Sequence, residues 1–84
     1  MRGHVNREQI LGKIRDVLAD VVDDDSLQLT EATVADDVPE WDSINHVKLL
    51  IGLEQEFHIR FDTEELGGLK NVGELIDLIQ TKLG

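Results

Sequence analysis

The chain has 84 residues, no cysteine, and a net charge of −10 that comes from 18 acidic and 8 basic residues. This composition excludes a disulfide framework, a thiolate metal site and a cysteine nucleophile, and its charge disfavours nucleic acid as a partner. A chain this short has little interior for an enclosed active site, so we expect residues 1–84 to form one domain, ordered over about residues 6–83, that functions at its surface.

Helical periodicity begins at about Arg7 and continues to Val22. The apolar residues of this stretch fall at i, i+4, i+7, i+8 and i+11, which is one face of a helix: Ile10, Ile14, Val17, Leu18 and Val21. Asn6 is the predicted N-cap, and Gln9 is its expected partner in a capping box.

A long connection is predicted over residues 23–42, which include the only proline, Pro39. Leu27 and Leu29 alternate with polar residues, a pattern that would allow a short extended piece. We interpret the whole segment as a loop, and a loop this long in a compact domain is often functional.

The second predicted helix runs from about Ser43 to Phe57. Its apolar arc covers more than half of the helical circumference: Ile44, Val47, Leu50, Ile51, Leu53 and Phe57. Such a helix is normally packed by neighbours on several sides, so we expect it to be the central helix. We expect the opposite, exposed stripe to hold Asn45, Lys48, Gly52, Gln55 and Glu56. Glu54 falls inside the apolar arc, and its carboxylate is expected to reach the rim.

Two further helices are expected in the last part of the chain. A short helical turn is predicted over residues 63–66, ended by Gly67 and Gly68. The last helix starts at Asn71, with Glu74 as its capping-box partner, and its apolar face is formed by Val72, Leu75, Ile76, Ile79 and Leu83. The predicted fold is therefore all-α: a four-helix bundle with three longer helices, one short third helix and a long first loop.

Ser43 stands where the long loop becomes the second helix, directly after Asp42. Both residue types are preferred N-caps, so the pair can be a cap and nothing more. The start of a helix also tolerates a phosphate, because it offers free N–H groups and the positive end of the helix dipole. A second Asp-Ser-Leu sequence surrounds Ser26, but no helical stripe follows it, and we therefore prefer Ser43 as the functional serine.

Two ring side chains flank this pair. His46, with Ser43 and Asp42, superficially resembles a hydrolase triad, but the sequence identifies no oxyanion hole or substrate pocket. We therefore expect no catalysis, and a packed histidine at the rim of the helix. Trp41 is expected to anchor its loop on the core, with contact to a cofactor or partner as the alternative.

The sequence resembles the acyl carrier proteins of the phosphopantetheine-binding family, specifically a stand-alone bacterial-type carrier. The resemblance covers about residues 6–83 and is carried by Asp42-Ser43-Ile44, by Val47, Leu49 to Ile51, Leu53 and Glu54 to Phe57, and by residues 71–79. It implies that Ser43 carries 4′-phosphopantetheine, added from coenzyme A by a phosphopantetheinyl transferase that uses Mg²⁺. It further implies that Asp42 belongs to the transferase recognition motif, and that the cofactor thiol holds acyl or aminoacyl groups as thioesters.

The sequence also departs from the common pattern of the family, first at Ile44, which stands where leucine is usual. Asn45 and Lys48 stand where fatty-acid-synthesis carriers are acidic, and Trp41 before Asp42 is similar to stand-alone carriers of specialised pathways. We therefore expect docking to the acyl-loading and acyl-processing enzymes of a dedicated pathway, through Ile44, Asn45, Val47, Lys48 and Ile51. The alternative is an acidic helical protein–protein interaction module that is not modified.

The location expected from the sequence is cytoplasmic. No apolar run approaches the roughly 18 residues that span a bilayer, and Met1 to Ile10 lack the apolar core of a signal peptide. We expect a monomer that does not insert into membranes.

Overall fold

The computed structural model describes residues 6–62 and 71–83. These residues form the α-helices α1 (Arg7–Val22), α2 (Ser43–Phe57) and α4 (Val72–Leu83), together with a single 3-10 turn, η1 (Ala35–Asp37). They contain no strand, so the all-α prediction is confirmed. The short helix predicted over residues 63–66 lies outside the described residues.

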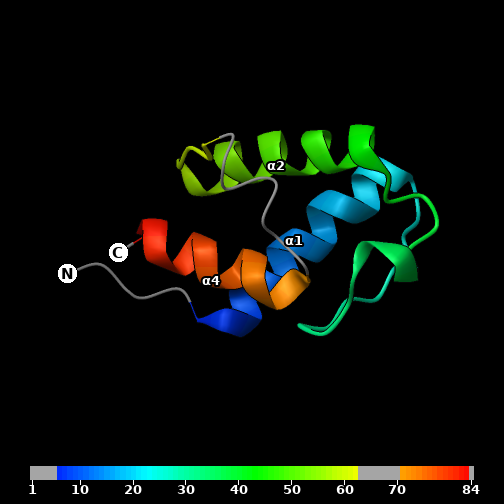
Figure 1. Cartoon of the computed structure of the whole chain (residues 1–84), viewed down its shortest axis with the longest axis horizontal. Coiled ribbons are helices and arrows are strands. Elements are labelled where there is room, and N and C mark those ends of the chain that lie inside the picture. The colour runs from blue at the N-terminus through cyan, green and yellow to red at the C-terminus, as the bar shows by residue number, and fades with distance from the viewer. Residues whose placement is uncertain (1–5, 63–70, 84) are drawn as a thin grey trace.

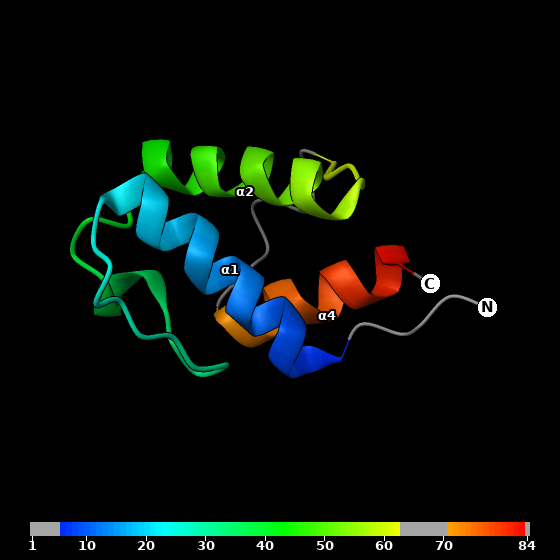
Figure 2. The same cartoon turned by 180° about the vertical axis from the view of Figure 1, so that it is seen from behind.

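Helix α1 packs against both of the other helices. Figures 1 and 2 show α1 crossing obliquely past α2 on one side and α4 on the other. The loop over residues 23–42 lies at the end of the molecule where α2 begins. None of the helices in the described ranges is long and apolar enough to cross a membrane.

Local side-chain caps fix where the helices begin. The Asn6 side chain accepts from the Gln9 N–H at 2.8 Å, and the Gln9 side chain accepts from the Asn6 N–H at 3.0 Å, which confirms the predicted capping box. At the start of α4, Asn71 Oδ1 accepts from the Glu74 N–H at 2.8 Å. These caps satisfy N–H groups that have no partner inside the helix, so the sequence alone predicts both starts well.

The core lies where the apolar stripes of the three helices meet. Among the described residues, the largest fully buried side chains are Ile10, Ile14, Leu18, Leu49, Leu53, Val72, Leu75, Ile76 and Ile79. Burying one side chain of this kind stabilises the fold by about 1.5–3 kcal/mol. The stripes predicted for the first and last helices therefore face the core, except at Val21, where Val22 packs against the core instead.

The prediction for the second helix is wrong in two respects. Ile44, Val47 and Ile51 were assigned to a buried arc, yet they are 68%, 51% and 49% exposed. Gly52 was assigned to the exposed stripe, yet it is partly buried and faces α1, whereas Glu56 is exposed as predicted and reaches Lys13 of α1. A Cβ on Gly52 would lie 2.7 Å from the Val17 side chain, and Glu56 pairs with Lys13 at 3.1 Å.

The predictions fail because an apolar arc this wide does not by its sequence pattern indicate which part of it the neighbouring helix covers. Helix α1 covers the side of α2 that presents Leu49, Gly52 and Leu53, where glycine permits close approach. The remaining apolar side chains of α2 are left at the surface.

The long loop is fixed by tertiary contacts. Leu27, Val38 and Trp41 are buried in the core cluster. The Arg15 side chain donates from Nε to the Leu27 carbonyl at 2.9 Å and from its terminal nitrogen to the Asp25 carbonyl. No strand forms at residues 27–29, and the turn η1 was not predicted.

Arg7 ties three segments together at the other end of this loop. Its guanidinium donates twice to the Glu31 carboxylate, at 3.0 and 2.6 Å, and once to Asp77 Oδ1 of α4, at 2.5 Å. The hydrogen bonds that Arg7 donates to Glu31 and Asp77 raise the pKa of Arg7, and the same pairing lowers the pKa of Glu31. The N-terminus of α1, the loop and α4 are therefore held by one side chain.

Candidate functional site

Helix α2 begins with an aspartate cap. Asp42 has an extended backbone, and its Oδ1 accepts from the Asn45 N–H at 2.8 Å. The Asp42 carbonyl accepts from the His46 N–H at 2.8 Å, as the first bond of the helix. Asp42 is therefore the N-cap, which leaves Ser43 as the first helical residue with no capping role.

Ser43 is exposed, and its hydroxyl makes no hydrogen bond to any residue in the described ranges. Its own N–H and that of Ile44 belong to the first turn of the helix, where N–H groups lack helical partners. The positive end of the helix dipole lies at the same place. A phosphate ester on Ser43 Oγ would therefore find free donors and a favourable field, partly offset by the adjacent Asp42 carboxylate.

The competing serine is in a different environment. Ser26 Oγ donates to Asp24 Oδ1 at 2.7 Å, and the Ser26 N–H donates to the same oxygen at 3.0 Å. These hydrogen bonds lower the pKa of Asp24. The neighbouring Leu27 is buried, and no helix begins at Ser26. The Ser26 hydroxyl is already hydrogen-bonded within the loop, so the geometry favours Ser43 as the functional serine.

Trp41 and His46 contact each other across the start of α2. Trp41 is only 8% exposed, and its Nε1–H donates to His46 Nδ1 at 3.1 Å, with the ring centroids 5.9 Å apart. The expectation that Trp41 anchors its loop on the core is confirmed. Because His46 Nδ1 accepts this bond and Ser43 makes none, the two do not form the hydrogen-bonded pair of a hydrolase triad. Burial lowers the pKa of His46.

Asn45 is also engaged at the start of the helix. Its Nδ2 donates to the Glu40 carbonyl at 2.7 Å, and the side chain is half-buried. The structure therefore places this predicted docking residue between the loop and the helix, where it holds the chain that leads to Ser43. Sequence reasoning missed this role, because a main-chain acceptor in a loop leaves no pattern in the sequence.

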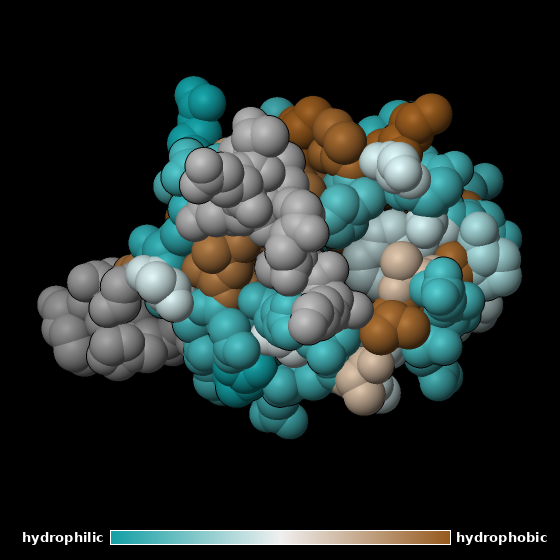
Figure 3. Space-filling model, in the orientation of Figure 1, coloured by the Kyte–Doolittle hydropathy of each residue, from teal (hydrophilic) through white to brown (hydrophobic). Residues whose placement is uncertain are grey.

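The other four predicted docking residues share one exposed face. Ile44, Val47, Lys48 and Ile51 are spaced at i, i+3, i+4 and i+7, so they lie on one side of α2. We call these four residues the α2 patch. In Figure 3, brown apolar surface lies along the upper edge of the molecule, where α2 runs. Within the described part of the chain, Lys48 has no ion-pair partner.

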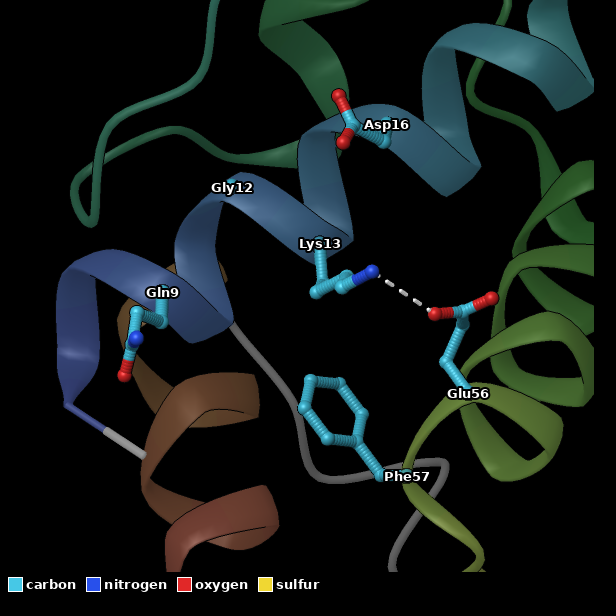
Figure 4. Close-up of a pocket in the computed structure, with 6 residues that line it drawn as sticks. All are labelled: Gln9, Gly12, Lys13, Asp16, Glu56 and Phe57. Atoms are coloured by element: carbon cyan, nitrogen blue, oxygen red, sulfur yellow. Dashed lines mark ion pairs between the residues drawn. The ribbon is translucent and has the colours of Figure 1, made fainter. Parts of the chain in front are cut away.

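A groove lies between α1 and α2, at the end of α2 away from Ser43. It has a volume of about 500 Å³ and is lined by Gln9, Gly12, Lys13, Asp16, Glu56 and Phe57. Figure 4 shows the ion pair from Lys13 to Glu56 crossing it. The groove is open to solvent, and no group of three potential metal ligands occurs among the described residues.

Comparison with known proteins gives a consistent result. No family model matches the chain. It is 32% identical to the acyl carrier protein of Thermotoga maritima over 80 residues, which covers 94% of this chain and 98% of the relative. It is 34% identical to the acyl carrier protein of Thermosynechococcus vestitus, with the same two coverages.

Two solved structures are also similar. The solution structure of a holo acyl carrier protein from Geobacter metallireducens has a TM-score of 0.79 and 44% identity, over 87% of this chain and 84% of that one. The crystal structure of the acyl carrier protein from Thermotoga maritima has a TM-score of 0.84 and 26% identity, over 98% and 95%.

Proposed function

This chain belongs to the acyl carrier proteins, and on that premise we propose that Ser43 carries a 4′-phosphopantetheine arm. Acyl carrier proteins hold acyl groups for other proteins to act on, and this chain is a carrier and not an enzyme. The observation that supports the proposal is the exposed Ser43 hydroxyl, which has no hydrogen-bond partner in the described ranges and lies at the first residue of α2.

The attachment is a phosphoryl transfer. Ser43 Oγ forms a bond to the phosphorus that bears pantetheine, and the pyrophosphate bond of coenzyme A breaks. Adenosine 3′,5′-bisphosphate leaves, and the serine proton passes to a base on the transferase. The chain contributes an accessible hydroxyl and the field of a helix start, which favours the negative ester that forms.

The attached arm supplies a thiol, which the cysteine-free chain lacks, for holding acyl or aminoacyl groups as thioesters. Tethering then raises the effective concentration of the cargo at a docked enzyme, to the order of mM for a short flexible link. An acidic chain with a net charge of −10 would also be steered toward basic surfaces on its partners.

We assign docking to the α2 patch, with Asp42 as part of the surface that the transferase reads. Exposed apolar side chains next to the modified serine fit a partner that covers the start of α2. Lys48 places a positive charge among them, which would disfavour partners that present a basic group there. We extend the proposal to acyl-loading and acyl-processing enzymes of a dedicated pathway as the partners, and to a cytoplasmic monomer as the form that acts.

Incubation with coenzyme A, Mg²⁺ and a broad-specificity phosphopantetheinyl transferase tests the proposal. Intact mass should show the addition of one phosphopantetheine to the wild-type chain and to Ser26→Ala, and none to Ser43→Ala, with all three chains folded by circular dichroism. Labelling of Ser43→Ala would disprove the assignment. If several transferases fail to modify the folded wild type, the interaction module becomes the better interpretation.

A further inference from the structure

Trp41 and His46 occupy two special positions at the start of α2. Trp41 directly precedes the cap Asp42, and His46 is the fourth residue of the helix. Side chains at these two positions often pack together as a staple, which fixes the angle at which the chain enters the helix. Here the staple is made by two rings that are in contact and also share a hydrogen bond of 3.1 Å.

A second bond crosses the same stretch in parallel. Asn45 Nδ2 donates to the Glu40 carbonyl at 2.7 Å. This bond and the one from Trp41 to His46 each connect residues five apart, and each joins the loop to the first turn of α2. Asp42 is held as the cap by the Asn45 N–H. Within the described ranges, every side chain from Trp41 to His46 that can form hydrogen bonds does so, except that of Ser43.

The contact between Trp41 and His46 is not needed to cap α2. Asp42 already satisfies the Asn45 N–H, so the start of α2 is capped without Trp41 or His46. What the staple adds is a fixed direction for residues 41–43 relative to the helix axis. A reaction at Ser43 Oγ depends on that direction, because a misplacement of about 1 Å can lower the rate of a positioned reaction severalfold or more.

We propose that Trp41 and His46 are positioning residues, which hold Ser43 in the orientation that phosphopantetheine transfer requires. The inference rests on the proposed function, because it concerns how that same serine is presented. Neither residue touches the reacting atoms, and both act through the backbone of residues 41–43. His46 contributes an acceptor at its δ position, and Trp41 contributes the matching donor.

Steady-state transfer kinetics on the full chain, below the unfolding transition of every variant, test this proposal. His46→Leu introduces a helix-forming side chain that still fills space but has no hydrogen-bond acceptor. His46→Asn restores an acceptor at the same δ position, and Trp41→Phe keeps a ring but removes the donor. Gln55→Leu, at an exposed position farther along α2, is the matched control.

We expect His46→Leu and Trp41→Phe to lower kcat about threefold to tenfold with little change in KM for the carrier, the factor that one neutral hydrogen bond corresponds to. His46→Asn should recover most of the loss, and Gln55→Leu should behave as wild type. A purely structural role would leave kcat unchanged, because every variant is folded under the assay conditions.

Two results would overturn the inference while leaving the proposed function intact. One is wild-type kcat for both His46→Leu and Trp41→Phe, and the other is a His46→Asn variant as slow as His46→Leu. Failure of the folded wild type to be modified at all is a different result, because it overturns the proposed function and the positioning role with it.

Discussion

Gly52 of α2 lies so close to Val17 of α1 that a Cβ atom on Gly52 would stand 2.7 Å from Val17 Cγ1. Real Cβ contacts are essentially never that short, so the absence of a side chain at Gly52 lets the two helices approach as they do. This approach directs Leu49 and Leu53 into the core and leaves the α2 patch outside.

Gly52→Ala is therefore expected to destabilise the chain. Overpacking a core costs about 1–3 kcal/mol, and the Val17 side chain has little rotamer freedom in a helix with which to move aside. The gain of about 1 kcal/mol from replacing glycine by alanine in a helix offsets part of that cost. Urea unfolding should show a net loss of up to about 2 kcal/mol.

Gly12→Ala is the matched control, because nothing lies within 4 Å of the Cβ that it would add to α1. It should stabilise the chain by up to about 1 kcal/mol. In the double variant Gly52→Ala/Val17→Ala the clash is removed, so the two changes should couple favourably. Strict additivity, or a Gly52→Ala variant as stable as Gly12→Ala, would contradict the close contact.

The two sides of α2 should respond differently to truncation. Leu50→Ala removes a side chain that is only 3% exposed, and it should cost about 2–5 kcal/mol of unfolding free energy. Ile51→Ala removes one that is 49% exposed, and we expect a change within about 0.5 kcal/mol. Equal losses at both positions in urea unfolding would show that the patch is covered in the native chain.

His46 should make stability depend on pH just below neutrality. Burial lowers its folded-state pKa below the ordinary 6.5, so the unfolded chain takes up the proton first. The unfolded state then binds more protons, and the free energy of unfolding falls as pH drops below about 6.5 toward the folded-state pKa. Urea unfolding followed by the emission of Trp41, the only tryptophan, measures this fall.

In the His46→Leu variant that part of the pH dependence should be absent. Carboxylates lose their contributions only at lower pH, near their own pKa values, so the two effects separate. If the unfolding free energy changed equally with pH in the wild type and in His46→Leu between about pH 7.5 and 5.5, burial would not affect the titration of His46.

Arg7→Gln should lower the melting temperature at neutral pH, because it removes the two hydrogen bonds to Glu31 and the one to Asp77. Arg7→Lys should recover only part of the loss, since lysine cannot bond a carboxylate with two parallel N–H groups. Thermal unfolding followed by circular dichroism gives both values.

The part of the Arg7 effect that depends on Glu31 should be lost in acid, whereas the bond from Arg7 to the neutral Gln80 side chain does not titrate. Arg7 lowers the folded-state pKa of Glu31 below its ordinary 4.5, so the stabilisation is fully present above that value. It is lost as pH falls through the lower folded-state pKa. The gap between the melting temperatures of the wild type and Arg7→Gln should therefore narrow as pH falls below 4.5, and a constant gap would refute the linkage to Glu31.

Local sequence signals predicted the helices well. Helix α1 at residues 7–22 and helix α2 at residues 43–57 begin and end where the periodicity and caps placed them. Asn6 and Asn71 cap their helices as expected, because a cap and its partner lie only three residues apart. The same local reading singled out Ser43 at a helix start, next to the aspartate that caps it.

The helical class, the helix limits and the candidate serine could all be predicted from the amino-acid sequence, since each depends on interactions within a few residues. The buried side of α2 could not be predicted in this way, because it depends on the approach of α1 at Gly52 and Val17 in the folded chain. The tertiary structure also revealed the bond from Trp41 to His46 and the bonds that join Arg7 to Glu31 and Asp77. Such contacts depend on how separate segments are placed in space, which periodicity along one helix does not specify.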